Sequence, residues 1–299
     1  LGMNPEFLRE GNAIEDFMSP DRIVLGYEDL DTLYLLEKLY ESWNIDKVKV
    51  NCRTAELIKY ANNSMLALQI SASNEIANLA ASIGGIDSIE VFKAVHLDKR
   101  WNPINQNGVR ANPAILDYMI PGCGFGGSCF PKDIEALVAL GDFKKNEMKI
   151  MKSVLEVNYS QPHQVIKIIE KDIPNLKNKN ALILGLAFKP DTDDVRESAS
   201  SKIIKDLTDR EVNVVAHDPI AINNFENNYK EISKKIKFTE NWISSIKDVD
   251  IIIICTKWDD YMELKKLDLS DKIIFDARRM FNFNDFENKG YYRSIGLRV

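Results

Sequence analysis

Short apolar runs alternate with helical stretches through the second half of the chain, and this alternation limits the possible folds more than any other feature. Such an order of strands and helices is typical of a doubly wound parallel sheet. The run from Ile251 to Ile254 contains no polar residue, as expected for a strand buried in a parallel sheet. The sequence therefore predicts a doubly wound α/β domain over residues 161–299, with strands at 181–185, 212–216, 251–255, 272–275 and 291–295.

An apolar pattern with helical spacing runs from Thr54 to Ile83 and stops at Gly84 and Gly85. Thr54 is the expected N-cap residue. A helix of this length spans about 45 Å, which is more than a small domain needs. We therefore expect the helix over residues 54–83 to pack against a second copy of the chain in a homodimer.

The remainder of the first half is predicted to be less regular. Residues 1–45 resemble the tail of a domain, with a loop at 4–19, a strand at 22–26 and a helix at 29–43. Further helices are expected at 88–95, after Pro131 and at 145–160, with a polar loop at 98–112. The chain is thus predicted to comprise three parts, namely residues 1–45, a helical central part at 46–160, and the α/β domain at 161–299.

The composition excludes several classes of protein. A chain of 299 residues with 45% hydrophobic residues exceeds what one core usually organises. The net charge of -6 and the lack of a basic cluster argue against nucleic acid as a partner. No apolar run reaches the roughly 18 residues of a membrane span, so we expect no membrane partner and a cytoplasmic location.

Cysteine and histidine spacing predicts no metal site. The cysteines form no C-x-x-C pair and the histidines form no spaced ligand set. Free thiols fit a reducing compartment. Cys52 and Cys255 are expected to be buried as small apolar side chains.

Cys129 lies on a glycine-dense loop, residues 121–131, and is the candidate reactive thiol. Glycines allow close approach of a substrate and leave backbone N–H groups free to face an oxyanion. Pro131 is typical of a first helical turn, so Cys129 should lie at a helix N-terminus. The partial positive charge there favours the ionised, nucleophilic thiol.

Two further loops follow expected strands, at 185–198 and 276–279, where parallel sheets bind ligands. Neither loop contains G-x-G-x-x-G. The phosphate-binding fingerprint of a dinucleotide site is therefore missing from both loops.

Four segments resemble, in order, the UDP-glucose and GDP-mannose dehydrogenase family: residues 4–11, 55–63, 124–133 and 187–198. The resemblance implies an N-terminal NAD-binding Rossmann domain, a helical dimerisation region and a C-terminal Rossmann-like domain that holds the nucleotide of the sugar. It also implies that this chain lacks most of the NAD-binding domain and is inactive without it.

The implied reaction is oxidation of UDP-glucose to UDP-glucuronate, with NAD as cofactor, through a thiohemiacetal and a thioester on Cys129. Lys59 and Asn63, one helical turn apart, would stabilise the oxyanion. Asp133 would activate the hydrolytic water, and Glu6 would position substrate or water. Competing interpretations are a solvated lysine for Lys59 and a helix-dipole carboxylate for Asp133.

The resemblance implies two further groups of site residues. Arg100 would reach the neighbouring subunit's substrate, although the loop that follows it is longer than in familiar members. Ala277, beside Arg278, stands where glycine is common, and Phe130 has a core aromatic as its alternative role. The substrate-binding group is Phe130, Lys189, Arg100, Arg278 and Gly126, and the cofactor-binding group is Glu10, Lys132 and Arg196.

Other functions remain open from the sequence. The substrate could be GDP-mannose or another nucleotide sugar, or the chain could bind a UDP-sugar without catalysis. A thiol redox sensor built on Cys123 and Cys129 is a third possibility, although the two lack C-x-x-C spacing.

Overall fold

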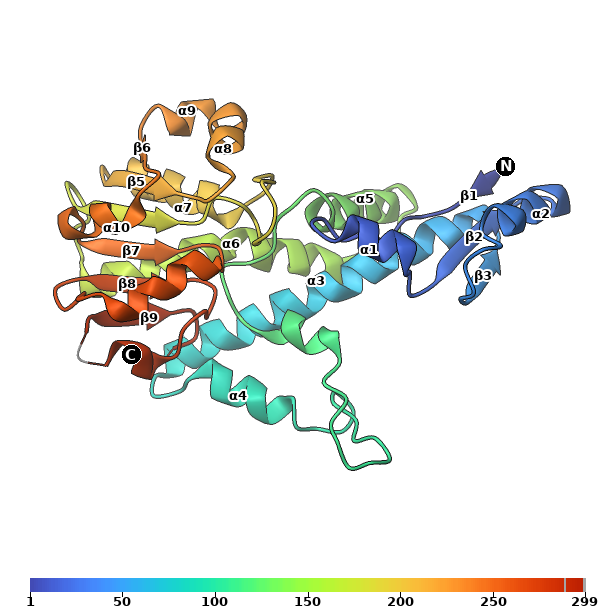
Figure 1. Ribbon diagram of the computed structural model, residues 1–299, viewed down its shortest axis with the longest axis horizontal. Helices are drawn as coiled ribbons and strands as arrows, with labels where there is room; N and C mark the ends of the chain where they lie inside the picture. The colour runs from blue at the N-terminus through green and yellow to red at the C-terminus, as the bar shows by residue number, and fades with distance from the viewer. Residues whose placement is uncertain (288, 298–299) are drawn as a thin grey trace. The chain divides into compact units, whose positions relative to one another are not determined.

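The computed structural model describes residues 1–287 and 289–297 and confirms the expected α/β fold class (Figure 1). The chain divides into two compact units, residues 1–65 and 66–299. The long helix α3 (Cys52–Ile83) contributes residues to both.

The larger unit contains a six-stranded parallel sheet in the order β6-β5-β4-β7-β8-β9 (Figure 1). This is the strand order of a Rossmann fold. All five predicted strands are confirmed, whereas β6 was missed because two residues are too short to show a pattern. The strands are β4 (Asn180–Leu184), β5 (Asn213–His217), β6 (Lys237–Phe238), β7 (Ile251–Ile254), β8 (Ile273–Asp276) and β9 (Tyr291–Ser294).

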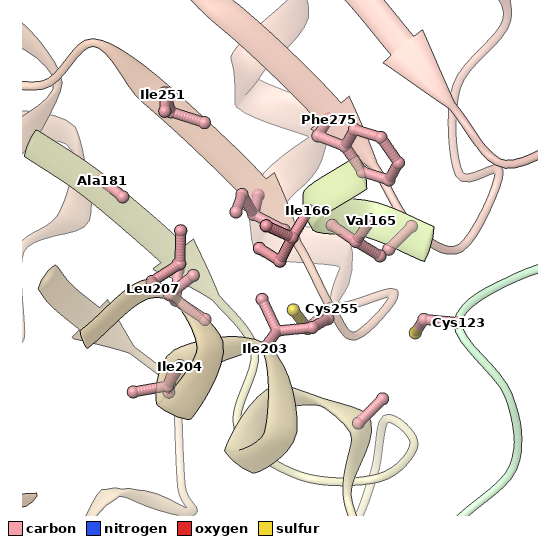
Figure 2. Packing of buried hydrophobic residues seen from close by; sticks show 14 of the residues in the cluster. Cys123, Val165, Ile166, Ala181, Ile203, Ile204, Leu207, Ile251, Cys255 and Phe275 are labelled. Atoms are coloured by element: carbon pink, nitrogen blue, oxygen red, sulfur yellow. The ribbon is translucent and has the colours of Figure 1, made fainter. Parts of the chain in front are cut away.

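Alternate residues of each central strand pack on opposite faces of this sheet. Ile251 and Ile253 join the cluster that α6 (Lys149–Asp172) and α7 (Ala199–Asp209) cover (Figure 2). Ile252 and Ile254 belong to the cluster on the other face. Burial on both faces explains why β7 is apolar throughout.

Helix α6 continues twelve residues beyond its predicted end at Ser160 and contains Pro162 in its interior. A proline there costs about 3 kcal/mol. Val165, Ile166 and Ile169 are fully buried after it, and each such side chain contributes about 1.5–3 kcal/mol. Burial against the sheet therefore outweighs the cost of the proline.

The other helices of the larger unit follow the sequence closely. Helix α4 (Ser88–Val95) has the predicted bounds, and Ser198 caps α7 by accepting a hydrogen bond from the N–H of Ser200. The remaining elements are α5 (Phe130–Phe143), α8 (Ile222–Asn228), α9 (Lys230–Ser233), α10 (Trp242–Ser245) and four 3-10 turns, η1 (Ala114–Met119), η2 (Ile246–Asp248), η3 (Asp259–Lys266) and η4 (Phe283–Phe286).

The smaller unit holds a three-stranded sheet, β1-β2-β3, with β1 (Gly2–Met3) antiparallel to β2 (Ile23–Tyr27) and β3 (Lys47–Val50) parallel to it. Helix α1 (Ala13–Met18) replaces part of the loop predicted at 4–19, and α2 (Leu30–Leu39) ends before the predicted residue 43. Strand β3 was missed although its lysines and valines alternate.

The predicted N-cap of the long helix is wrong. Helix α3 begins at Cys52, and the side-chain oxygen of Asn51 accepts a hydrogen bond from the N–H of Thr54 at 2.8 Å. Asn51 therefore has the capping role expected of Thr54.

Within residues 1–287 and 289–297, no helix is both long enough and apolar enough to cross a membrane.

Candidate functional site

The loop at residues 121–129 ends at Cys129, which occupies the N-cap position of α5. This confirms the predicted placement of the thiol at a helix N-terminus. Side chains from distant elements hold the loop in place. Asn74 on α3 accepts from the N–H of Gly122 at 2.8 Å, and Asn158 on α6 both accepts from and donates to the backbone of Phe125.

Two glycines of the loop allow it to approach its neighbours. A Cβ at Gly126 would lie 2.3 Å from the carbonyl oxygen of Glu197, which is backbone and cannot move away cheaply. Gly124 has a φ of +93°, and a Cβ there would lie 2.6 Å from the side-chain oxygen of Asn158. Gly126 therefore allows the cysteine loop to lie against the loop at 185–198, and Gly124 allows it to lie against α6.

Cys129 is half-buried, and its sulfur lies 3.7 Å from the hydroxyl of Ser128. The N–H groups of Gly126, Ser128 and Cys129 make no hydrogen bond within the described part of the chain. Amide donors without an acceptor beside a thiol are suited to stabilise an oxyanion formed at that sulfur.

A cavity of about 340 Å³ opens beside this loop. Lys132 and Arg196 supply two cations to its wall. Asp133, only 3% exposed, accepts a hydrogen bond from Lys132 at 2.6 Å, so a buried carboxylate lies directly behind the cavity wall. The lining residues are Gly127, Ser128, Pro131, Lys132, Glu135, Arg196 and Glu197.

The loop at 185–198 carries the cations Lys189 and Arg196. Asp194 orients Arg196 through two parallel hydrogen bonds of 2.8 and 2.9 Å, and the backbone carbonyl of Arg196 accepts from the N–H of Gly127. The Lys189 ammonium lies 5.7 Å from the centre of the Phe188 ring. The predicted cofactor residue Arg196 is thereby tied to the cysteine loop.

Arg278 joins three segments of backbone. Its guanidinium donates to the carbonyl oxygens of Cys255 at 2.7 Å, Gly124 at 2.8 Å and Phe188 at 3.2 Å. These acceptors lie after β7, in the cysteine loop and in the loop after β4. The side chain predicted to bind substrate thus organises the loops around the site.

Cys123 lies in the same loop as Cys129 but in a different environment. It is 1% exposed and belongs to the apolar cluster that also contains Cys255 (Figure 2). Burial raises the pKa of both the Cys123 and the Cys255 thiols. The structure therefore disfavours a redox pair of Cys123 and Cys129, and it confirms that Cys255 and Cys52 are buried.

In the smaller unit, the Lys59 ammonium forms an ion pair of 3.2 Å with Glu6 and lies 5.6 Å from the centre of the Phe7 ring. Asn63 is buried, and its side-chain oxygen faces the amide group of Asn62. Glu10 is half-buried at the turn before α1. Glu6 and Lys59 are therefore brought together.

Arg100 and Phe130 occupy contrasting places in the larger unit. Arg100 is 86% exposed and pairs with Asp98, and this bond lowers the pKa of the Asp98 carboxyl to about 2. Phe130 packs edge to face on Phe125 and tilts against Tyr118. Its ring belongs to an apolar cluster at the start of α5.

Residues that fix the loops were missed from the sequence. Asn158 and Gln161 are buried on α6, and Gln161 donates to the carbonyl of Gly122 at 2.9 Å. Both interrupt the apolar stripe between Val154 and Val165, which was the available signal. Asp194 gave no comparable signal because it lies in a stretch of several acidic residues.

Comparison with known proteins agrees with this combination of a Rossmann-like sheet and a cysteine loop. Models of the UDP-glucose/GDP-mannose dehydrogenase family match residues 1–44 (NAD binding domain), 53–160 (central domain) and 182–283 (UDP binding domain). The chain belongs to this family. The match to the NAD binding domain supports NAD as the cofactor.

Individual relatives are similar over nearly all of the chain. A UDP-glucose 6-dehydrogenase of Rickettsia conorii is 39% identical, and the match covers 100% of this chain and 67% of that protein. A UDP-glucose 6-dehydrogenase of Haloferax volcanii is 35% identical, and the match covers 94% of this chain and 62% of that protein. The solved structure of a UDP-glucose dehydrogenase from Pyrobaculum islandicum is 37% identical in sequence and has a TM-score of 0.86. The match covers 99% of this chain and 63% of that chain. The chain thus spans 62–67% of the length of these relatives.

Residues 1–65 do not by themselves fit the diphosphate of a dinucleotide. Their one crossover between parallel strands within the described residues 1–65 runs from β2 through α2 to β3. This crossover has no G-x-G-x-x-G sequence, the mark of the first βα turn that binds the diphosphate. Asp29 caps α2 there and accepts a hydrogen bond from the N–H of Thr32 at 2.7 Å. A carboxylate at this helix N-terminus would repel a phosphate.

Proposed function

We propose that the whole protein oxidises UDP-glucose to UDP-glucuronate with NAD as the electron acceptor. The observation that carries the proposal is Cys129, half-buried at the N-terminus of α5, beside open amide N–H groups and next to a cavity whose wall includes Lys132 and Arg196. The names of the relatives and the match to a UDP binding domain support this substrate class.

In this proposal the Cys129 sulfur adds to the aldehyde carbon of the oxidised sugar and forms a thiohemiacetal. The open N–H groups near Cys129 stabilise its oxyanion, and Lys59 and Asn63 are assigned the same role from the motif at 55–63. Loss of a hydride gives the thioester. Water, activated by Asp133, attacks the thioester carbon, the C–S bond breaks, and the acid is released as the thiol recovers its proton.

Four electrons leave the sugar as two hydrides, one from the alcohol and one from the thiohemiacetal. Each sugar therefore consumes two equivalents of NAD. In any preparation of the protein that reduces NAD with UDP-glucose, Cys129→Ser is expected to stop release of the acid. An unchanged yield of acid would remove Cys129 from the mechanism.

The remaining site assignments come from the family motifs. Lys189, Phe130, Gly126 and Arg278 are assigned to the nucleotide sugar, with Arg100 reaching the substrate of a neighbouring subunit. Glu6 is assigned to positioning of substrate or water. The residues assigned to NAD are Glu10, Lys132 and Arg196. The position of Lys132 and Arg196 on one cavity wall supports their shared assignment.

A homodimer through α3 is part of this proposal. Ile76, Leu79 and Ile83 lie at helical spacing on α3 and are exposed. A contiguous apolar face on a long helix favours association with a second copy. Analytical ultracentrifugation of the wild-type chain and of Leu79→Glu tests this directly, with a dimer expected only for the wild type.

A non-catalytic UDP-sugar-binding protein is the second candidate, favoured by the poor fit of residues 1–65 to a dinucleotide. Calorimetry on this chain separates the two. UDP-glucose that binds without measurable affinity for NAD would favour the binding protein, whereas binding of both ligands would favour the enzyme. Absence of UDP-glucose binding would contradict both.

A further inference from the structure

Asp218, the residue directly after β5, is 2% exposed and its carboxylate is saturated by donors. One oxygen accepts from the N–H of Leu186 at 2.8 Å and of Ala187 at 3.1 Å, and from the indole of Trp258 at 3.1 Å. The other accepts from the N–H groups of Ile220 and Ala221 at 3.0 and 2.9 Å. Asp218 thus binds its own turn and two loops from neighbouring strands.

The position of Asp218 corresponds to a ligand-binding position in dinucleotide folds. There, the loop after the first strand offers its N–H groups to a phosphate, and an acidic residue after the second strand binds a ribose hydroxyl. Here β4 and β5 are those strands, by their places in the sheet order. The N–H groups of Leu186 and Ala187 donate to Asp218 instead, so neither these amides nor the carboxylate remain available to a ligand.

Both backbone groups of Ala187, its N–H and its carbonyl, fix the loop after β4. Its N–H donates to Asp218, and its carbonyl accepts from the hydroxyl of Thr256, after β7, at 2.5 Å. Lys189 follows two residues later. Because the N–H groups of Leu186 and Ala187 are occupied, recognition of an anion by this first part of the loop, residues 185–189, falls to the Lys189 ammonium.

We propose that Asp218 is a positioning residue that acts as an internal anion, fixing the loop after β4 so that Lys189 meets a phosphate of the nucleotide. The inference rests on the proposed binding of a UDP-sugar. The carboxylate substitutes for the phosphate that this loop would cradle in a dinucleotide site. Specificity for the nucleotide therefore depends on a buried residue that the ligand does not touch.

Calorimetry with UDP as the probe tests this on the wild-type chain, Asp218→Asn, Lys189→Ala and the double variant. Asn cannot accept hydrogen bonds through its amide nitrogen, so Asp218→Asn should raise the Kd of UDP about tenfold. The double variant should bind UDP no more than about twofold more weakly than Lys189→Ala alone, because both act through one contact. If the Kd of UDP in the double variant rises by the product of the two single-variant increases, the proposal is overturned.

Amide hydrogen exchange at Leu186 and Ala187 provides a readout that needs no ligand. Asp218→Asn should speed exchange at these amides at least about tenfold, while amides of β7 keep their protection. If Asp218→Asn does not fold, Thr256→Val loosens the same loop from the other side and should give the same pattern. If the wild type fails to bind UDP, the proposed function fails, and unchanged exchange in both variants would overturn the role of Asp218 itself.

Discussion

Replacing Arg278 with methionine is expected to destabilise the unit formed by residues 66–299. The change removes three hydrogen bonds from a charged donor to the carbonyls of Cys255, Gly124 and Phe188. Such bonds contribute about 1.5–3 kcal/mol each, or at least about 4.5 kcal/mol together. Because Arg278 is half-buried, water replaces part of this hydrogen bonding in the variant. We therefore expect the free energy of unfolding to fall by about 2–4 kcal/mol.

Urea unfolding followed by tryptophan fluorescence measures this loss, and thermal unfolding should show a Tm lower by roughly 4–16 °C. Arg210→Met is the matched control. Arg210 at the end of α7 donates to Glu170 on α6, which joins two helices away from the loops, and to the carbonyl of Asp206 within α7. Only Arg278→Met should also weaken UDP binding. A loss below about 0.5 kcal/mol, or equal effects of the two variants on UDP binding, would refute the role of Arg278 as a link between loops.

Three further outcomes are expected. Gly126→Ala places a Cβ against the Glu197 carbonyl and should cost about 1–3 kcal/mol of stability and lower UDP affinity in calorimetry. Asn158→Leu leaves the buried N–H and carbonyl of Phe125 without partners and should cost about 2–5 kcal/mol in urea unfolding. Burial lowers the pKa of His217, so the unfolded chain binds its proton first as pH falls below 6.5. Wild-type stability should therefore fall between pH 7 and 5, and His217→Gln should flatten that dependence; an equal slope in both would exclude His217 as the cause.

Elements with strong local patterns were predictable from the sequence. The apolar run of β7 and the helical spacing of α3 carry their own signals, because burial on defined faces dictates which residues are apolar. Elements whose bounds depend on tertiary packing were not predictable from the sequence. Helix α6 passes through Pro162 only because the residues after it are buried against the sheet, and the two-residue strand β6 has no period to detect.

The candidate site shows the same division. The placement of Cys129 at the start of α5 followed from local signals, namely the glycines and Pro131. The side chains that shape the loops, such as Asn158 and Asp218, bind backbone groups more than thirty residues away. A local sequence pattern does not show which distant residues a side chain contacts. These residues could be identified only from their burial and hydrogen bonds in the folded chain.

Thiol alkylation by iodoacetamide, followed by peptide mass spectrometry, tests most directly whether Cys129 is a nucleophile within a nucleotide-sugar site. We expect Cys129 to react first, because Cys123 and Cys255 are buried in the apolar cluster, and we expect UDP-glucose to slow its reaction. A Cys129 that reacts no faster than Cys123, or at the same rate with and without UDP-glucose, would contradict the proposed function.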